Sequence, residues 1–159
     1  MTFPSLQQPE NTTAGRTLRV SMVQTAFTPA TSGHDPRDEN LAHALEGIRS
    51  AADDGAELIV IGELFLQGPG GSQWASYYST RLDGSDDHVR ELERAAAELG
   101  VHIAMGCTSF GSPYDVHNSA LVVTPDRGLV GTYTRLTLPA SRTPGASRTS
   151  SPTTRRGEP

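Results

Sequence analysis

The sequence predicts an α/β layered fold in which helices cover a largely buried sheet. Three observations support it: apolar residues alternate at strand period, apolar stripes recur at helical period, and these segments follow one another in the order β-α-β-α-β-β-β. With 159 residues, 35% of them hydrophobic and 19% charged, the chain is long enough for one modest globular domain.

The first predicted strand follows a polar leader. Residues 1–16 include two prolines and show no alternation, so we expect them to be disordered. Leu18, Val20 and Met22 then alternate with polar residues. This is the period of a half-buried strand, which we expect to run to Gln24.

A helix is predicted over residues 37–53. Asp35 is able to cap it, and Pro36 suits its first position because proline lacks the amide hydrogen that would be unpaired there. Gly55 stands where a helix C-cap belongs. The expected buried face is an apolar stripe made of Leu41, Ala44, Leu45 and Ile48.

The next two elements are a strand and a second helix. The continuous apolar run Leu58–Ile61 is typical of a central strand covered on both faces, and it ends at Glu63. Residues 68–71 (Gly-Pro-Gly-Gly) break regular structure and form either an active-site loop or a plain turn. Residues 85–87 can open the helix, and Gly100 closes it. Its predicted buried face consists of Val89, Leu92, Ala96 and Leu99.

Three more strands complete the pattern. The third strand includes Cys107 and begins with the alternating residues Val101, Ile103 and Met105. Residues 116–123 and 129–134 indicate two further strands. They are joined by residues 124–128, in which proline favours a turn and glycine allows a positive φ, so a hairpin is expected.

Several short motifs resemble the nitrilase, or carbon-nitrogen hydrolase, superfamily. The segment GAELIVIGELFL, residues 55–66, resembles the stretch that ends the family's second strand on a catalytic glutamate. The family's next hairpin is matched in order and spacing by Asn118-Ser119-Ala120, Pro125-Asp126 with Gly128, and Gly131-x-Tyr133. The resemblance covers residues 17–138. It implies that this domain is the truncated half of an α-β-β-α sandwich.

The resemblance also implies a chemistry. In this family a cysteine thiol attacks an amide, nitrile or carbamoyl carbon, a glutamate acts as general base, and a lysine stabilises the developing negative charge, without a cofactor. The general base matches Glu63. The lysine position holds Arg135, whose planar guanidinium does not replace an ammonium group freely. The nucleophile would lie on a later strand, and no cysteine follows residue 107.

These departures leave two functional hypotheses. In the first, the chain is a carbon-nitrogen hydrolase by descent but is inactive as it stands. In the second, it is a non-catalytic binding or regulatory subunit that pairs with an intact relative. Because relatives of this kind often pair their sandwiches, self-association is a further expectation. Half a sandwich should also leave an apolar face and an unpaired sheet edge exposed.

Other catalytic and metal sites find little support in the sequence. Cys107 precedes Arg135, the wrong order for the family nucleophile, and we interpret it as a small core residue. The five histidines show no metal-ligand spacing. We therefore expect neither a metal site nor a role for Cys107 as a substitute nucleophile.

The charge distribution separates the domain from a tail. Residues 1–138 carry nine Arg against seventeen Asp and Glu, net -8, whereas residues 139–159 carry four Arg and one Glu, net +3. An acidic body argues against a nucleic-acid partner, and no apolar window is long enough to span a membrane, so we expect a cytoplasmic chain.

The tail is rich in Pro, Ser, Thr and Arg, and it contains no large apolar residue from Pro139 onward. It is expected to be disordered. We hypothesise a frameshift near codons 134–138.

Overall fold

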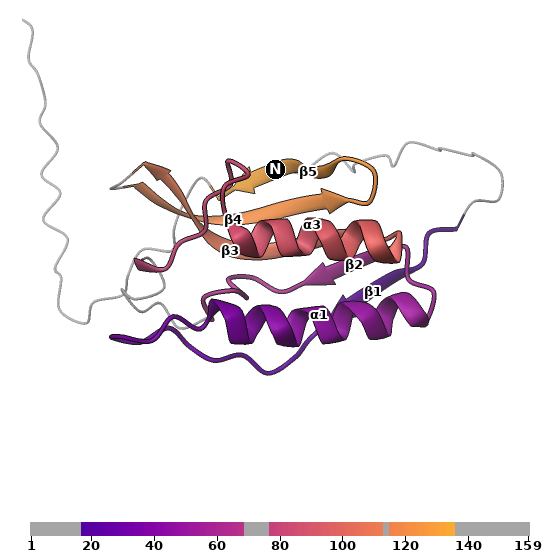
Figure 1. The fold of residues 1–159 in the computed structure, drawn as a ribbon, viewed down its shortest axis with the longest axis horizontal. Coiled ribbons are helices and arrows are strands. Elements are labelled where there is room, and N and C mark those ends of the chain that lie inside the picture. Colours follow the sequence, from indigo (N-terminus) through magenta and orange to yellow (C-terminus); the bar gives the residue numbers. More distant parts are fainter. Residues whose placement is uncertain (1–16, 69–76, 113–114, 136–159) are drawn as a thin grey trace, which may run out of the picture.

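A sheet with two covering helices forms the part of the chain that the computed structural model describes, residues 17–68, 77–112 and 115–135. Within these ranges the elements follow one another in the predicted order (Figure 1). The strands are β1 (Val20–Val23), β2 (Leu58–Ile61), β3 (His102–Ser112), β4 (Asp115–Thr124) and β5 (Gly128–Thr134), and the helices are α1 (Arg37–Asp53) and α3 (Asp87–Leu99). No helix in the described ranges is both long and apolar enough to cross a bilayer.

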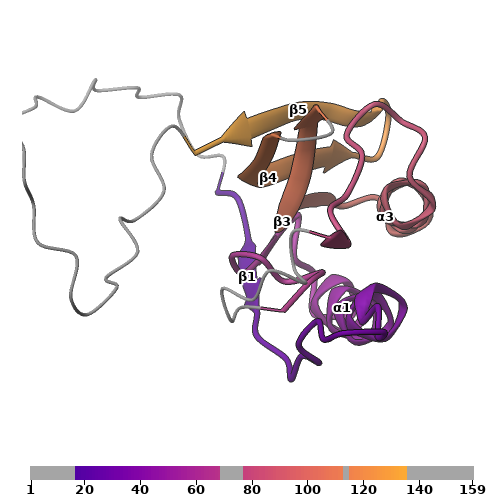
Figure 2. The ribbon, with the colours of Figure 1, turned by 90° about the vertical axis from the view of Figure 1, so that its left-hand side faces the viewer.

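The five strands form one mixed sheet in the order β1-β2-β3-β4-β5. The first three strands run parallel and are linked through α1 and α3, whereas β4 and β5 return antiparallel as a hairpin. Right-handed crossovers that step in the same direction place their helices on the same face. Figure 2 shows both helices on one side of the sheet, which leaves the opposite side, here named the open face, without a helix.

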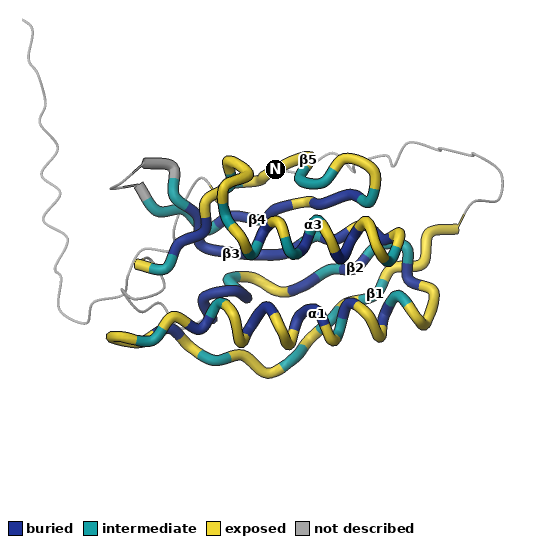
Figure 3. The backbone as a smooth tube through the Cα atoms, in the orientation of Figure 1, coloured by how far each residue is buried: buried dark blue, intermediate teal, exposed yellow. Residues whose placement is uncertain are grey.

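The hydrophobic core lies between the helices and the sheet. The predicted stripe of α1 and the predicted residues Val89, Leu92 and Ala96 of α3 are buried, while Leu99 is partly buried against the core. They pack on Ile59 and Ile103, and β3 is buried along most of its length (Figure 3). Each fully buried side chain of this size contributes about 1.5–3 kcal/mol by leaving water.

The helix ends match the predicted signals with two corrections. The C-cap of α1 is Asp54, and Gly55 follows it with φ +82°. Pro36 is the N-cap of α1 and not its first helical residue. Because proline has no N–H, the first amide that needs a partner belongs to Arg37, and the Asp35 carboxylate accepts it at 3.1 Å. In α3, Asp86 accepts the N–H of His88 at 3.0 Å, and Gly100 ends the helix with φ +67°.

The prediction for β1 had the wrong face buried. The strand is shorter than expected, and Leu18, Val20 and Met22 are 55%, 50% and 84% exposed, while Val23 packs against the core. The physical reason is that the helices cover only one face, and the three alternating apolar residues lie on the other.

The prediction that β2 is covered on both faces was also wrong. Ile59 and Ile61 are buried beneath the helices, but Leu58 and Val60 are only half-buried on the open face. The expectation of an exposed apolar face is therefore confirmed for the described residues. The edges of this sheet are β1 and β5.

Candidate functional site

Glu63 stands at the carboxyl end of β2, where the chain turns sharply. Gly62 leaves the strand, and the next residue but one, Leu64, has φ +54°, a left-handed conformation uncommon for a residue with a side chain. Strained backbone of this kind persists only where surrounding contacts impose it, and it is frequent at functional sites. The contacts that impose it here come from β3.

Gly106 of β3 is the residue against which this turn docks. Its N–H donates to the Gly62 carbonyl at 3.2 Å, and its carbonyl accepts the Phe65 N–H at 2.9 Å. A Cβ atom on Gly106 would lie 2.6 Å from the Glu63 Cα and 2.6 Å from the Gly62 oxygen, closer than real contacts allow. Only glycine therefore lets the backbone that carries Glu63 lie this close to β3.

Gln67 anchors the far end of the same turn. Its side chain is fully buried and donates to the carbonyls of Tyr78 and Thr108 and to the Thr80 hydroxyl, at 3.1, 3.3 and 3.0 Å. Its amide oxygen accepts the Thr108 N–H at 2.8 Å. The buried Asn40 of α1 also donates to the Leu66 carbonyl at 2.9 Å. These two amides fix the turn between the helix layer and β3.

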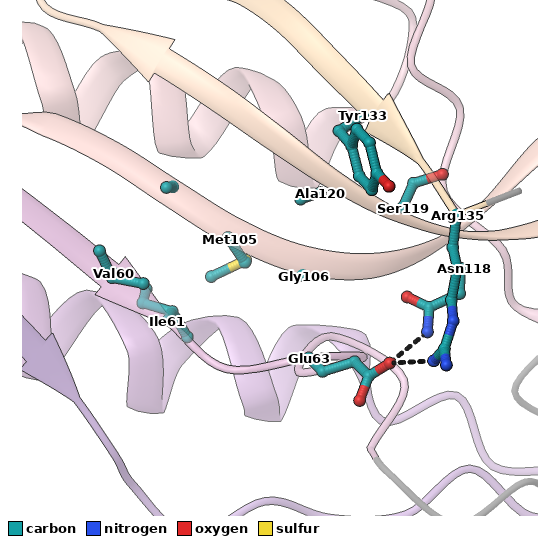
Figure 4. A pocket seen from close by; sticks show the side chains of 11 residues that line it. Val60, Ile61, Glu63, Met105, Gly106, Asn118, Ser119, Ala120, Tyr133 and Arg135 are labelled. Atoms are coloured by element: carbon teal, nitrogen blue, oxygen red, sulfur yellow. Dashed lines mark hydrogen bonds and ion pairs between the residues drawn. The ribbon is translucent and has the colours of Figure 1, made fainter. Parts of the chain in front are cut away.

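The Glu63 carboxylate faces Asn118 of β4 and Arg135, the residue that follows β5 (Figure 4). Its Oε1 atom accepts hydrogen bonds from the Asn118 side-chain amide and from Arg135 Nη1, the latter at 3.2 Å. The Arg135 backbone N–H in turn donates to the Asn118 carbonyl at 2.9 Å. Within the described ranges no residue bonds Oε2, so one carboxylate oxygen is held and the other is available.

The ion pair itself adds little stability. The Glu63 side chain is 62% exposed and that of Arg135 is 43% exposed, so water screens their attraction. Exposed pairs of this kind contribute about 0–1 kcal/mol. The hydrogen bonds therefore orient the carboxylate more than they stabilise the fold.

Two cavities meet at Glu63. One, of about 370 Å³, lies on the open face and is lined by Val60, Ile61, Glu63, Ala104, Met105, Gly106, Asn118, Ser119, Ala120, Tyr133 and Arg135. The other, of about 480 Å³, includes Met22, Phe27 and Phe65 as well as Glu63. The first cavity is apolar along the strands and polar at the end formed by Glu63, Asn118 and Arg135. That arrangement suits a small ligand with an apolar part and one polar group.

Cys107 lies in the core, as the sequence indicated. It is fully buried, in register with Ser119, and belongs to the side of the sheet that packs on the helices. Burial raises the pKa of its thiol to about 12, with a smaller contribution from Asp86. Because the thiolate is the nucleophilic form, this side chain does not supply an attacking group to the cavity.

A second polar cluster joins the N-terminal ends of the helices, away from Glu63. His88 contacts Asp86 at 3.0 Å and Asp38 at 2.9 Å, so it bridges α3 and α1. Its hydrogen bond with Asp86 raises the pKa of His88 more than burial lowers it. Burial alone would raise the pKa of Asp86, but hydrogen bonds from His88 and the Arg81 amide hold it below its ordinary value. This cluster stabilises the helix packing.

The described residues include no group of three or more His, Cys, Asp or Glu side chains that could hold a metal ion. The polypeptide segment 68–71 was interpreted as an active-site loop or plain turn, and its residues 69–71 lie outside the described ranges. The predicted leader and tail, residues 1–16 and 139–159, lie outside them as well.

The structure brings the two predicted site residues, Glu63 and Arg135, into direct contact. Sequence reasoning missed Gly106 as the docking point and used Asn118 only as part of a motif. The signal for Asn118 was available, because a polar residue on the apolar face of a strand needs a partner. Nothing local distinguishes Gly106, since its role depends on a backbone that is 43 residues earlier in the chain.

Solved structures with the same fold include amidases. An amidase from Nesterenkonia sp. superposes with a TM-score of 0.61 at 18% identity, and the match covers 76% of this chain and 43% of the amidase. A carbon-nitrogen hydrolase from Helicobacter pylori gives 0.60 at 17% identity, over 77% of this chain and 41% of that one. At these identities the likeness shows the fold, a layer of the kind found in nitrilase-superfamily amidases.

Curated relatives are similar in sequence. The omega-amidase of Xenopus tropicalis is 27% identical over 131 residues, which are 82% of this chain and 44% of the relative. The glutamine-dependent NAD(+) synthetase of Thermotoga maritima is 33% identical over 100 residues, 63% of this chain and 17% of the relative. This chain thus spans less than half the length of these relatives. The family model for carbon-nitrogen hydrolases matches residues 19–159, a range that includes the predicted tail. The chain therefore belongs to the carbon-nitrogen hydrolase family.

Proposed function

We propose that this chain carries the general-base side of a site that hydrolyses the carbon–nitrogen bond of a small amide. The observation that supports this most directly is the Glu63 carboxylate. One of its oxygens is held by Asn118 and Arg135, the other is available, and it stands at the polar end of an apolar cavity of about 370 Å³. Solved structures of variants of the Nesterenkonia amidase contain acrylamide and butyramide, which are amides of this size.

In the proposed reaction a thiol attacks the amide carbon. Glu63 takes the thiol proton at Oε2, the sulfur–carbon bond forms, and the carbonyl electrons move onto oxygen. When the tetrahedral adduct collapses, the carbon–nitrogen bond breaks, and the amine leaves with the proton that Glu63 returns. Water then attacks the thioester, again with Glu63 as base, and releases the acid and the thiol.

Arg135 is proposed to lie beside the developing negative charge. A guanidinium donates hydrogen bonds in fixed directions. Of the nitrogens of Arg135, Nη1 donates to the Glu63 carboxylate. Its other N–H groups can therefore reach a substrate oxygen in the cavity. A cation or donor in this role is commonly worth about 3–4 kcal/mol in the transition state.

None of the residues that line the cavity on the open face supplies a thiol. The 159 residues contain one cysteine, Cys107, which is buried with its pKa raised to about 12. We therefore propose that a polypeptide of these 159 residues does not turn over amides by itself. A small thiol in solution can replace the missing group in an experiment.

The test measures the transfer of the butyryl group from a butyryl anilide to 2-mercaptoethanol. The readout is the rate at which aniline is released. The expected result is no release without thiol, and a thiol-dependent rate that Glu63→Gln lowers by about 10²-fold or more, the usual size of general-base catalysis. Glu98→Gln, an exposed carboxylate on α3, is the matched control and should leave the rate unchanged. Equal rates for the native chain and Glu63→Gln would refute the proposal.

One observation favours the second hypothesis, a non-catalytic subunit that pairs with an intact relative. The open face exposes apolar residues that a partner could cover, among them Met22 and Tyr133. Stable binding to an intact relative without any thiol-dependent reaction would support it. A cytoplasmic location also stays a proposal, supported by the single unpaired cysteine.

A further inference from the structure

The loop between β1 and α1, residues 24–36 and here named the β1 loop, is bound to the turn that carries Glu63. The centre of this connection is Asn40, a fully buried residue of α1. Its Oδ1 atom accepts the Thr28 N–H at 2.7 Å. Its Nδ2 atom donates to the Thr28 carbonyl at 2.8 Å and to the Leu66 carbonyl at 2.9 Å. One side-chain amide therefore binds the loop twice and the turn once.

Two main-chain contacts strengthen the connection. The Ala30 N–H of the β1 loop donates to the Gln67 carbonyl of the turn at 3.1 Å. Gly68 has φ +77°, and a Cβ atom on it would stand 2.8 Å from the Thr28 oxygen and 2.9 Å from the Pro29 Cα. These distances are shorter than real contacts allow. The turn can therefore lie this close to the loop only because residue 68 has no side chain.

Burial of the Asn40 amide makes relative movement of the two segments costly. A shift of the β1 loop against the turn would break hydrogen bonds of a side chain that water does not reach. A buried polar group that loses its partner costs more free energy than a typical hydrogen bond contributes. The β1 loop and the turn should therefore move together.

The cavity of about 480 Å³ beside Glu63 is built from both segments. The β1 loop supplies Thr25 and Phe27, and the turn supplies Phe65 and Glu63 itself. Leu64, between these two turn residues, has φ +54°. Backbone in this conformation persists only where surrounding contacts impose it. The β1 loop adds a second set of such contacts to those that β3 provides.

We infer that Asn40 is a positioning residue for Glu63, because it holds the β1 loop and the turn together as one unit. It does not line either cavity beside Glu63, and it acts through the main chain of Thr28 and Leu66. The role of Asn40 in catalysis rests on the proposed function of Glu63. The connection between the two segments, however, can be measured without any reaction.

The first experiment is native-state hydrogen exchange on the unmodified chain, followed by NMR. The Ala30 N–H reports the bond between loop and turn, and the Phe65 N–H reports the bond between the turn and Gly106 of β3. In one unit, both amides should exchange with the same free energy of opening and the same dependence on urea. If Ala30 exchanges through a smaller opening that leaves Phe65 protected, the loop moves independently and the inference is overturned. This measurement decides even where a variant fails to fold.

Two variants break the connection from opposite sides. Asn40→Asp keeps the shape of the side chain, but an ionised aspartate cannot donate to the two carbonyls. Gly68→Ala places a methyl group against the β1 loop. Gly84→Ala is the matched control, because Gly84 also has a positive φ, +81°, but a Cβ atom there meets no atom within 4 Å. Circular dichroism checks that each variant is folded.

The second measurement is the NMR signal of the Glu63 carboxyl carbon, which is identified by its loss in Glu63→Gln. The chemical shift of this carbon depends on the hydrogen bonds that the carboxylate accepts. It should change in both test variants and keep its native value in the control. The thiol-dependent reaction should slow by about tenfold or more in the same two variants, because a small displacement of a reacting group is costly.

A carboxyl signal that stays unchanged in both test variants overturns the inference, because the turn would then hold Glu63 without Asn40. An equal change in the control also overturns it, since lost stability alone would then move the signal. If the signal changes as expected but the native chain shows no thiol-dependent reaction, the proposed function of Glu63 fails while its positioning by Asn40 is supported.

Discussion

Replacement of Gly106 by alanine should detach the turn that carries Glu63 from β3. The new Cβ would stand 2.6 Å from the Glu63 Cα, 2.6 Å from the Gly62 oxygen and 2.9 Å from the Leu64 nitrogen. All three are main-chain atoms, so no side chain can rotate away to make room. The turn has to move, and the two hydrogen bonds between it and Gly106 are lost or lengthened.

The cost follows from these contacts. Two backbone hydrogen bonds contribute about 0.5–1.5 kcal/mol each, and overpacking adds about 1–3 kcal/mol. Gly106→Ala should therefore lower the free energy of unfolding by about 2–6 kcal/mol. The measurement is urea denaturation followed by circular dichroism. Gly106→Ala should also abolish the thiol-dependent reaction, because the Glu63 carboxylate moves away from Asn118.

Gly131→Ala is the matched control, a glycine in β5 with an open site: a Cβ there meets no atom within 4 Å. Alanine in a strand is normally neutral or slightly stabilising relative to glycine. If Gly106→Ala and Gly131→Ala unfold at the same urea concentration, the claim that Gly106 positions Glu63 through close contact is wrong.

Three further predictions concern the helices and the core. His88→Gln should destabilise the chain more at pH 6 than at pH 8.5, as measured by thermal unfolding. The hydrogen bond with Asp86 raises the pKa of His88 in the folded chain. The stability that the charged His88 contributes is therefore present below the unfolded-state pKa of about 6.5, and it is lost as the pH rises through the folded-state pKa. An equal loss at both pH values would argue against a charged bridge. Gln67→Leu should lower the free energy of unfolding by about 1–3 kcal/mol in urea denaturation, since the Thr108 N–H is left buried without its acceptor. A loss below about 1 kcal/mol would contradict this. Cys107 should react with iodoacetamide at pH 8 only after urea unfolds the chain, because burial raises the pKa of its thiol to about 12; rapid labelling of the folded chain would show that the thiol is accessible.

Local elements were predictable from the sequence because their signals are local. The helix over 37–53 was predicted with its observed bounds. The start of α3 was placed within residues 85–87, and the turn over residues 124–128 was predicted from residue types alone. Apolar stripes at helical spacing identified the buried faces of α1 and α3 correctly. The resemblance of residues 55–66 to a carbon-nitrogen hydrolase segment identified the family, which the family match confirms.

The pairing of Glu63 with Arg135 was only partly predictable. Family resemblance assigned both positions, but their contact depends on β3 and β4 lying between β2 and β5 in the sheet. Asn118 joins them because it projects from β4 toward the end of β2, a relation between residues 55 positions apart. No window of the sequence contains this information. The catalytic roles of both residues stay predictions until the thiol-dependent reaction is measured.

By itself, the sequence determined the kinds of element, their order and the family, since propensity, periodicity and motifs act over neighbouring residues. Only the tertiary structure decided which face of β1 is buried, because alternation marks two faces but does not say which one the helices cover. Tertiary structure also decided that Gly106 must be glycine, through a close backbone approach that no local pattern records. Burial and long-range contact are properties of the packed chain. They decide that the apolar residues of β1 lie on an exposed face and that the Glu63 carboxylate lies beside Asn118 and Arg135.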